Sequence, residues 1–82
     1  MRFDVYQLAN ELDLESNTVR TWLSNYRFNK SRLSGRPLAY NVTKDFLTTL
    51  EAYLCTKKQN SKIKQTIRHL QFLRWRIGNE LG

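Results

Sequence analysis

The fold is decided by the run VYQLANELDLESNTVRTWLSNY, residues 5–26 of the 82-residue chain. The spacing i, i+3, i+4, i+7 collects side chains on one stripe of a helix, and the first half of the run has it at Val5, Leu8, Ala9 and Leu12. The second half repeats the spacing at Val19, Trp22, Leu23 and Tyr26. Residues 13–15 interrupt the pattern. The run therefore predicts two short helices, joined by a tight turn, that bury their apolar stripes.

The starts of both helices are indicated by capping residues. Asp4 is a favourable N-cap, Gln7 completes a capping box, and Phe3 precedes them as a partner for Leu8 in a hydrophobic staple. We expect the first helix to begin at Val5. Ser16 carries a hydroxyl that accepts hydrogen bonds from free backbone N–H groups, so we expect the second helix to begin at Asn17.

Beyond this pair, residues 27–40 lose the helical period, and residues 34–37 (SGRP) favour a turn. A β-hairpin is predicted, with a first strand near residues 28–33 and a second over 38–42. In the second strand, Leu38, Tyr40 and Val42 alternate onto one face.

Two more helices are predicted in the rest of the chain. Thr43 caps a third helix running to about Lys57, and its stripe is Phe46, Leu47, Leu50, Tyr53 and Leu54. Residues 56–60 form a polar connector, and Asn60 or Ser61 caps a fourth helix that ends near Gly78. The stripe of the fourth helix is Ile63, Ile67, Leu70, Leu73 and Ile77.

Composition narrows the class of protein. The length suits one compact core, and 40% apolar residues are enough to order it without disulfides or metal. Cys55 is the only cysteine and His69 the only histidine, which argues against zinc. No apolar run approaches the roughly 20 residues that cross a bilayer, and no secretion signal is recognisable. We therefore expect a cytoplasmic protein that does not enter a membrane.

The net charge of +7 suits attraction to a polyanion, most commonly nucleic acid. It is unevenly distributed: residues 52–82 contain seven Lys and Arg against Glu80 alone, which gives +6 and leaves +1 for the rest. The C-terminal part should therefore attract anions more strongly than the N-terminal helix pair.

The outer face of the second helix has the chemistry of a DNA-reading helix. Asn17, Thr21 and Ser24 lie opposite its apolar stripe, and Thr18, Arg20 and Asn25 flank them. Asn pairs with adenine, Arg pairs with guanine, and Ser or Thr reaches bases or phosphates. A helix-turn-helix reads DNA with such a face, braced by the preceding helix.

At this point residues 5–54 resemble the DNA-binding domains of the MerR and phage excisionase group. The matching positions are Leu8-Ala9 and Leu12 in the first helix, Leu14 after the turn, Ser16, and the run Thr18-Val19-Arg20-Thr21-Trp22. Residues 35–40 (GRPLAY) are similar to the group's basic wing, and residues 43–47 (TKDFL) are similar to the start of the helix that follows it. The resemblance implies a winged helix-turn-helix in which Arg36 and neighbouring cations contact phosphate or the minor groove. The chain departs from the group at Asp13, where Gly is commoner, and it continues into no long coiled coil or effector domain.

These observations predict a mainly α fold: a winged helix-turn-helix with a small β-hairpin wing and an additional C-terminal helix. Residues 1–58 would form the DNA-binding domain, and residues 59–82 a basic helix packing on it or on a partner. We expect sequence-specific binding of double-stranded DNA, in transcription regulation or control of site-specific recombination, by a nucleoid-associated protein. The predicted DNA contacts are Ser16, Asn17, Thr18, Arg20, Thr21, Ser24, Asn25, Arg27, Lys30, Arg32, Arg36 and Lys44.

Two alternatives stay open. In the fourth helix, Arg68, Phe72, Trp75 and Arg76 project away from the apolar stripe, and aromatic residues beside Arg are typical of interface anchors. They predict self-association or a protein partner, so the chain is alternatively a protein-interaction adaptor. RNA binding led by the basic fourth helix is the other alternative. No catalytic motif and no cofactor-binding motif is recognisable, so we expect neither an enzyme nor a cofactor.

Overall fold

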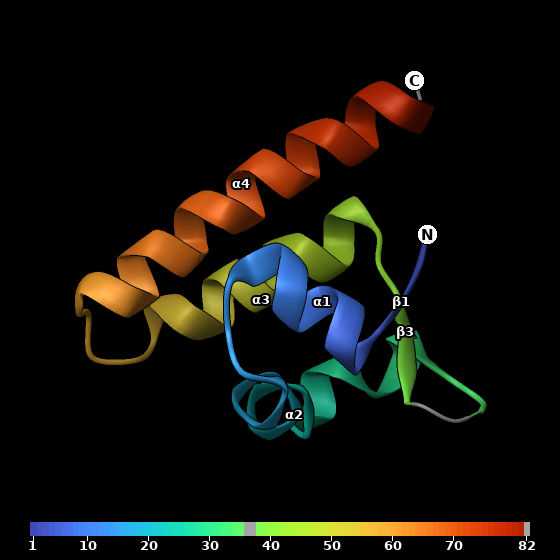
Figure 1. The fold of residues 1–82 in the computed structure, drawn as a ribbon, viewed down its shortest axis with the longest axis horizontal. Coiled ribbons are helices and arrows are strands. Elements are labelled where there is room, and N and C mark those ends of the chain that lie inside the picture. The colour runs from blue at the N-terminus through green and yellow to red at the C-terminus, as the bar shows by residue number, and fades with distance from the viewer. Residues whose placement is uncertain (36–37, 82) are drawn as a thin grey trace. The chain divides into compact units, whose positions relative to one another are not determined.

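The computed structural model describes residues 1–35 and 38–81, with side chains up to residue 79. The chain is mainly helical with a small antiparallel sheet, as predicted. Its elements in order are β1 (Arg2–Asp4), α1 (Val5–Leu12), α2 (Ser16–Leu23), the 3-10 helix η1 (Tyr26–Ser31), β2 (Arg32–Leu33), β3 (Ala39–Asn41), α3 (Lys44–Cys55) and α4 (Ser61–Leu81) (Figure 1). Two compact units divide between Val42 and Thr43.

Helix α1 begins where the capping residues predict. The Asp4 carboxylate accepts from the Gln7 N–H at 2.8 Å, and the Gln7 side chain accepts from the Asp4 N–H at 2.9 Å. This reciprocal pair is a complete capping box. The four predicted stripe residues of α1 are all buried. The first helix of the pair is therefore confirmed in start, length and orientation.

Helix α2 begins one residue earlier than predicted. Glu15, not Ser16, is its N-cap, and it caps without a side-chain hydrogen bond. The Glu15 carbonyl already accepts from the N–H groups of Thr18 and Val19, at 3.1 and 3.2 Å. Because the helical hydrogen bonds start at Glu15, Ser16 lies inside the helix and the prediction of Ser16 as the cap is wrong.

The predicted stripe of α2 is correct for Val19, Trp22 and Leu23, which are buried, and wrong for Tyr26. The helix ends at Leu23. The backbone of Asn25 is extended, and the Asn25 side chain accepts from the Arg27 N–H at 3.0 Å, which starts η1. Tyr26 is therefore on a different helix, where its side chain is 74% exposed.

The sheet has the order β1-β3-β2. β2 and β3 pair antiparallel, as the predicted hairpin requires, and residues 36–37 of its predicted turn lie outside the described residues. The predicted first strand over residues 28–33 is wrong, because residues 26–31 coil into η1 and only Arg32 and Leu33 pair with β3. β1 was not predicted, and its Phe3 pairs with Tyr40. The Val42 N–H and Met1 carbonyl extend this ladder at 2.7 Å. The central strand β3 is thus paired on both sides.

The second unit contains α3 and α4. Thr43 caps α3 as predicted, its hydroxyl accepting from the Phe46 N–H at 3.1 Å. Asn60 caps α4 by accepting from the Ile63 N–H at 2.9 Å. Helix α3 stops at Cys55, and α4 continues past Gly78 to Leu81. In the α4 stripe, Ile63, Leu70, Leu73 and Ile77 are buried as predicted, whereas Ile67 is half-buried and Thr66 is buried.

Arg74 links the two helices of the second unit. Its guanidinium donates to the Thr48 hydroxyl at 3.2 Å and pairs with the Glu51 carboxylate at 3.7 Å. Over the part of the chain that the structure describes, no helix is long and apolar enough to cross a membrane.

Candidate nucleic-acid interface

The corner between α1 and α2 is a tight turn of three residues, and Asp13 is the first of them. Asp13 has the left-handed conformation, φ 55° and ψ 48°. The Leu14 N–H donates to the Ala9 carbonyl at 2.9 Å, and the Asp13 N–H donates to the Asn10 carbonyl at 3.3 Å. These two bonds are the pair that defines a Schellman motif. Asp tolerates the left-handed backbone better than most residues, so the departure from Gly leaves the corner intact.

The outer face of α2 carries the polar residues that the sequence places there. Asn17, Arg20, Thr21 and Ser24 are exposed, whereas Ser16, Thr18 and Asn25 are half-buried. Two of the hydroxyls are engaged within the helix: the Thr21 hydroxyl donates to the Asn17 carbonyl at 2.9 Å, and the Ser24 hydroxyl donates to the Thr21 carbonyl at 2.7 Å. A hydroxyl that donates to its own helix still accepts hydrogen bonds, so this face presents acceptors at Thr21 and Ser24.

Arg20 is held by a residue of α1. Its Nη2 donates to the phenolic oxygen of Tyr6 at 2.7 Å, and its guanidinium carbon lies 5.3 Å from the centre of the Tyr6 ring. Both side chains are exposed. The contact restricts a long, flexible side chain, and this hydrogen bond uses one of the five N–H groups of the guanidinium. Arg20 is therefore a pre-oriented donor on the polar face.

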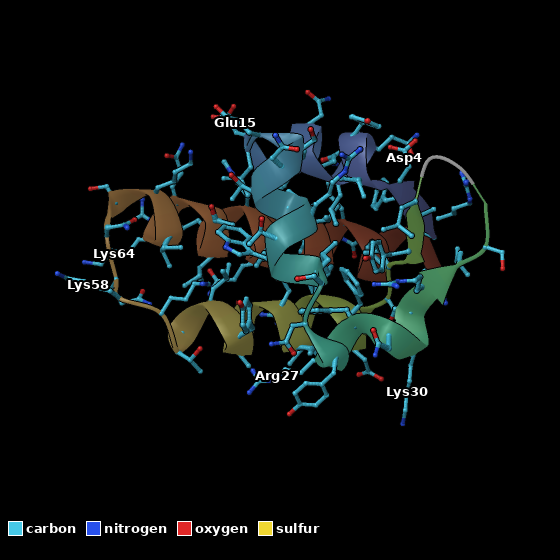
Figure 2. All side chains as sticks on the ribbon, turned by 90° about the horizontal axis from the view of Figure 1, so that it is seen from below. Asp4, Glu15, Arg27, Lys30, Lys58 and Lys64 are labelled. Carbon is cyan, nitrogen blue, oxygen red and sulfur yellow. The ribbon has the colours of Figure 1, made fainter. Side chains whose placement is uncertain are left out.

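Cations follow α2 along η1 and β2. Arg27, Lys30 and Arg32 are exposed, and Tyr26 adds an exposed phenol beside Arg27. Figure 2 shows Glu15 at one end of α2, and Arg27 and Lys30 beyond the other end. The surface is thus electrostatically graded along its length, from the carboxylates of Asp13 and Glu15 at the turn to the cations after Leu23.

Two predicted phosphate contacts fall outside the described part of the first unit. Arg36 lies outside the described residues. Lys44 belongs to the second unit, at the first turn of α3, where its aliphatic chain lies over Gly78 of α4. In the first unit, the predicted cationic contacts Arg20, Arg27, Lys30 and Arg32 are exposed on the segment that runs from α2 through η1 to β2.

The residues predicted to bind a protein partner lie on α4. Phe72 and Trp75 are 60% and 63% exposed, with ring centres 6.0 Å apart. Arg68 is exposed as well, whereas Arg76 is half-buried.

Sequence reasoning missed two tyrosines of the surface on α2 and η1. Tyr6 falls off the stripe of α1, and an aromatic residue on the polar side of an amphipathic helix was a usable signal. The sequence pattern predicts a buried Tyr26 because this residue continues the helical period of α2. The preceding Asn25 is a signal against that prediction, since an Asn side chain can hydrogen-bond to nearby backbone N–H groups and so end a helix.

Comparisons of the chain with protein-family models, curated proteins and solved structures found no match. Among the described residues, no group of three His, Cys, Asp or Glu side chains is placed to hold a metal ion.

Proposed function

We propose that the protein binds double-stranded DNA in a sequence-specific manner, with α2 as the recognition helix. On this proposal the first unit is a winged helix-turn-helix of the kind found in the MerR and phage excisionase group, and the hairpin of β2 and β3 is its wing. Regulation of transcription, or control of site-specific recombination, would follow from occupancy of a DNA site.

The observation that carries the proposal is the pre-oriented Arg20. An arginine that reads guanine offers two parallel N–H groups to O6 and N7 in the major groove. Immobilising such a side chain on binding costs entropy, and part of that cost is removed when the free protein already holds it. The bond to Tyr6 does this on the exposed face of the second helix of a tight-turn pair.

The charge gradient favours one orientation on the duplex. Phosphates are repelled by Asp13 and Glu15 at the start of α2 and attracted by Arg27, Lys30 and Arg32 beyond its end. We expect bases to be read from Asn17, Arg20 and their neighbours on α2. The three later cations would hold the backbone, because phosphate contacts fix register and base contacts supply sequence information.

The test is selection of bound sequences from a random duplex library at physiological salt, using the full chain. A sharp consensus is expected. Arg20→Ala should then weaken binding to the consensus site about fivefold or more, and to random duplex much less, because a good bidentate contact discriminates by about 1–3 kcal/mol. Lys30→Ala is the matched control: it should weaken both duplexes alike.

Two results would overturn the proposal: selection that yields no consensus, or structured RNA that displaces the consensus duplex. The second follows because the A-form major groove does not admit a recognition helix. Salt dependence gives a further check. Three phosphate-binding cations predict that log affinity falls against log salt with a slope of about −3, at about −0.9 per phosphate.

A further inference from the structure

The outer face of α4 combines charge and aromatic surface that the proposed DNA site does not use. Its N-terminal half exposes Lys64 and Arg68. Its C-terminal half exposes Phe72 and Trp75, whose rings stack on each other. From Lys64 to Trp75 the helix advances by about 16 Å, at 1.5 Å per residue. No acidic residue occurs in α4 before Glu80.

A shallow groove of about 510 Å³ lies beside Trp75 in the second unit. Its wall is formed by Trp75, Gln71 and Asn79, and its cationic residues are Lys44 and Arg74. Gly78 forms part of the lining, and the space over it is occupied by Lys44: a Cβ at Gly78 would lie 2.8 Å from the Lys44 Cε. The groove is therefore apolar along the indole and positively charged at its edge, which suits one large apolar side chain flanked by carboxylates.

We propose that this face of α4 binds an acidic amphipathic helix of a partner protein. About three turns of such a helix cover the distance from Lys64 to Trp75. Its apolar residues would lie on Phe72 and Trp75 with one anchor in the groove, and its carboxylates would pair with Lys64, Arg68 and Lys44. Aromatic residues and Arg in this arrangement are typical of the few side chains that dominate binding energy at protein interfaces.

Charge argues against a second copy of the chain as the occupant. Helix α4 carries five Lys and Arg up to residue 79, so two such helices side by side repel each other. Duplex DNA also fits poorly, because its phosphate backbone offers no apolar surface that would bury Phe72 and Trp75.

The experiment uses the full chain and a phage-displayed library of 16-residue peptides. Peptides enriched in Asp and Glu, with apolar residues at helical spacing, are expected. Their binding should shift the fluorescence of Trp75, measured in a Trp22→Phe background to leave one indole. Binding should weaken at least tenfold in Phe72→Ala, in Arg68→Glu and in the double variant F72A/W75A, the last two followed by peptide anisotropy. Asn29→Ala, which changes an exposed residue of the first unit, should leave binding unchanged.

The side chains altered on α4 are exposed, so each variant should keep the melting temperature of its own background, whether that is the parent chain or Trp22→Phe. Phe72→Ala and F72A/W75A keep the charge of the parent chain, so their affinity for duplex DNA should not change. That separates failure here from failure of the proposed DNA binding. The inference is overturned if no acidic amphipathic sequence is enriched, or if enriched peptides bind the double variant as tightly as the parent. It is equally overturned if sedimentation detects self-association that the double variant loses, or if a single-stranded oligonucleotide outcompetes the peptide.

Discussion

The left-handed backbone at Asp13 makes the corner between α1 and α2 open to a direct test. A left-handed conformation costs an ordinary L-residue about 1–2 kcal/mol, Asp less, and Gly nothing for lack of a Cβ. Asp13→Val should therefore lower the free energy of unfolding by about 1–2 kcal/mol. Asp13→Gly should raise it by about 0.5 kcal/mol, since relief of backbone strain is partly offset by the greater freedom of Gly in the unfolded chain.

For a domain of this size, 1 kcal/mol corresponds to about 4–8 °C in melting temperature. The Val variant should thus melt about 4–16 °C lower and the Gly variant about 2–4 °C higher. Urea unfolding followed by Trp22 fluorescence reports on the first unit, because Trp22 is buried there; Trp75→Phe removes the other indole.

Asp13→Asn is the control for charge, because Asn also tolerates the left-handed backbone. It should match the stability of the parent chain, and it should tighten DNA binding as much as Asp13→Gly does, since both remove one negative charge near the start of α2. A Val variant as stable as the parent, or a Gly variant less stable than it, would refute the tight corner described above.

Three further substitutions test other contacts. Tyr6→Phe removes the hydrogen bond to Arg20 and keeps the ring. Fluorescence anisotropy should show an affinity for the consensus duplex that is about 2–5-fold weaker, because an exposed charged contact contributes at most about 1 kcal/mol. The affinity for random duplex should not change. Tyr40→Phe removes the bond that the buried phenol donates to the Leu23 carbonyl at 3.4 Å, and urea titration should show a loss of about 0.5–1.5 kcal/mol. Thr66→Val should raise the melting temperature. The Thr66 hydroxyl donates only to the Lys62 carbonyl of its own helix, and the methyl group that replaces it buries apolar surface. A lower melting temperature would contradict this.

Local signals in the sequence were sufficient wherever a helix is short and capped. Asp4 with Gln7, and Thr43, mark helix starts because each side chain satisfies an N–H group within three residues of itself. The apolar stripe of α1 was predictable for the same reason, since one helical period determines which side chains face inward.

Features that depend on distant segments were not predictable in this way. β1 is three residues long, and it is a strand only because β3, nearly forty residues later, pairs with it. The bond between Tyr6 and Arg20 likewise joins residues fourteen apart, through the geometry of the turn. The residues of the candidate DNA-binding surface on α2 could thus be predicted from the sequence, whereas the contact of Tyr6 with Arg20 could be found only in the structure.

Either proposed surface, on α2 or on α4, could account for the attraction of this basic protein to DNA. The net charge of each unit indicates how the two contributions can be distinguished. Residues 1–42 contain six Lys and Arg against four Asp and Glu, a net charge of +2, and residues 43–82 contain eight against three, a net charge of +5. Non-specific attraction to any polyanion should therefore come mainly from the second unit, whatever its natural partner is. A salt slope near −3 is compatible with contacts from the first unit alone, whereas a slope steeper than about −5.4, the limit for the six cations of residues 1–42 at about −0.9 each, would require contacts from the second unit as well. Affinity for DNA alone therefore does not identify the surface that reads the sequence. That surface is identified if Arg20→Ala weakens binding to the consensus duplex and not to random duplex, because only a base contact distinguishes sequences.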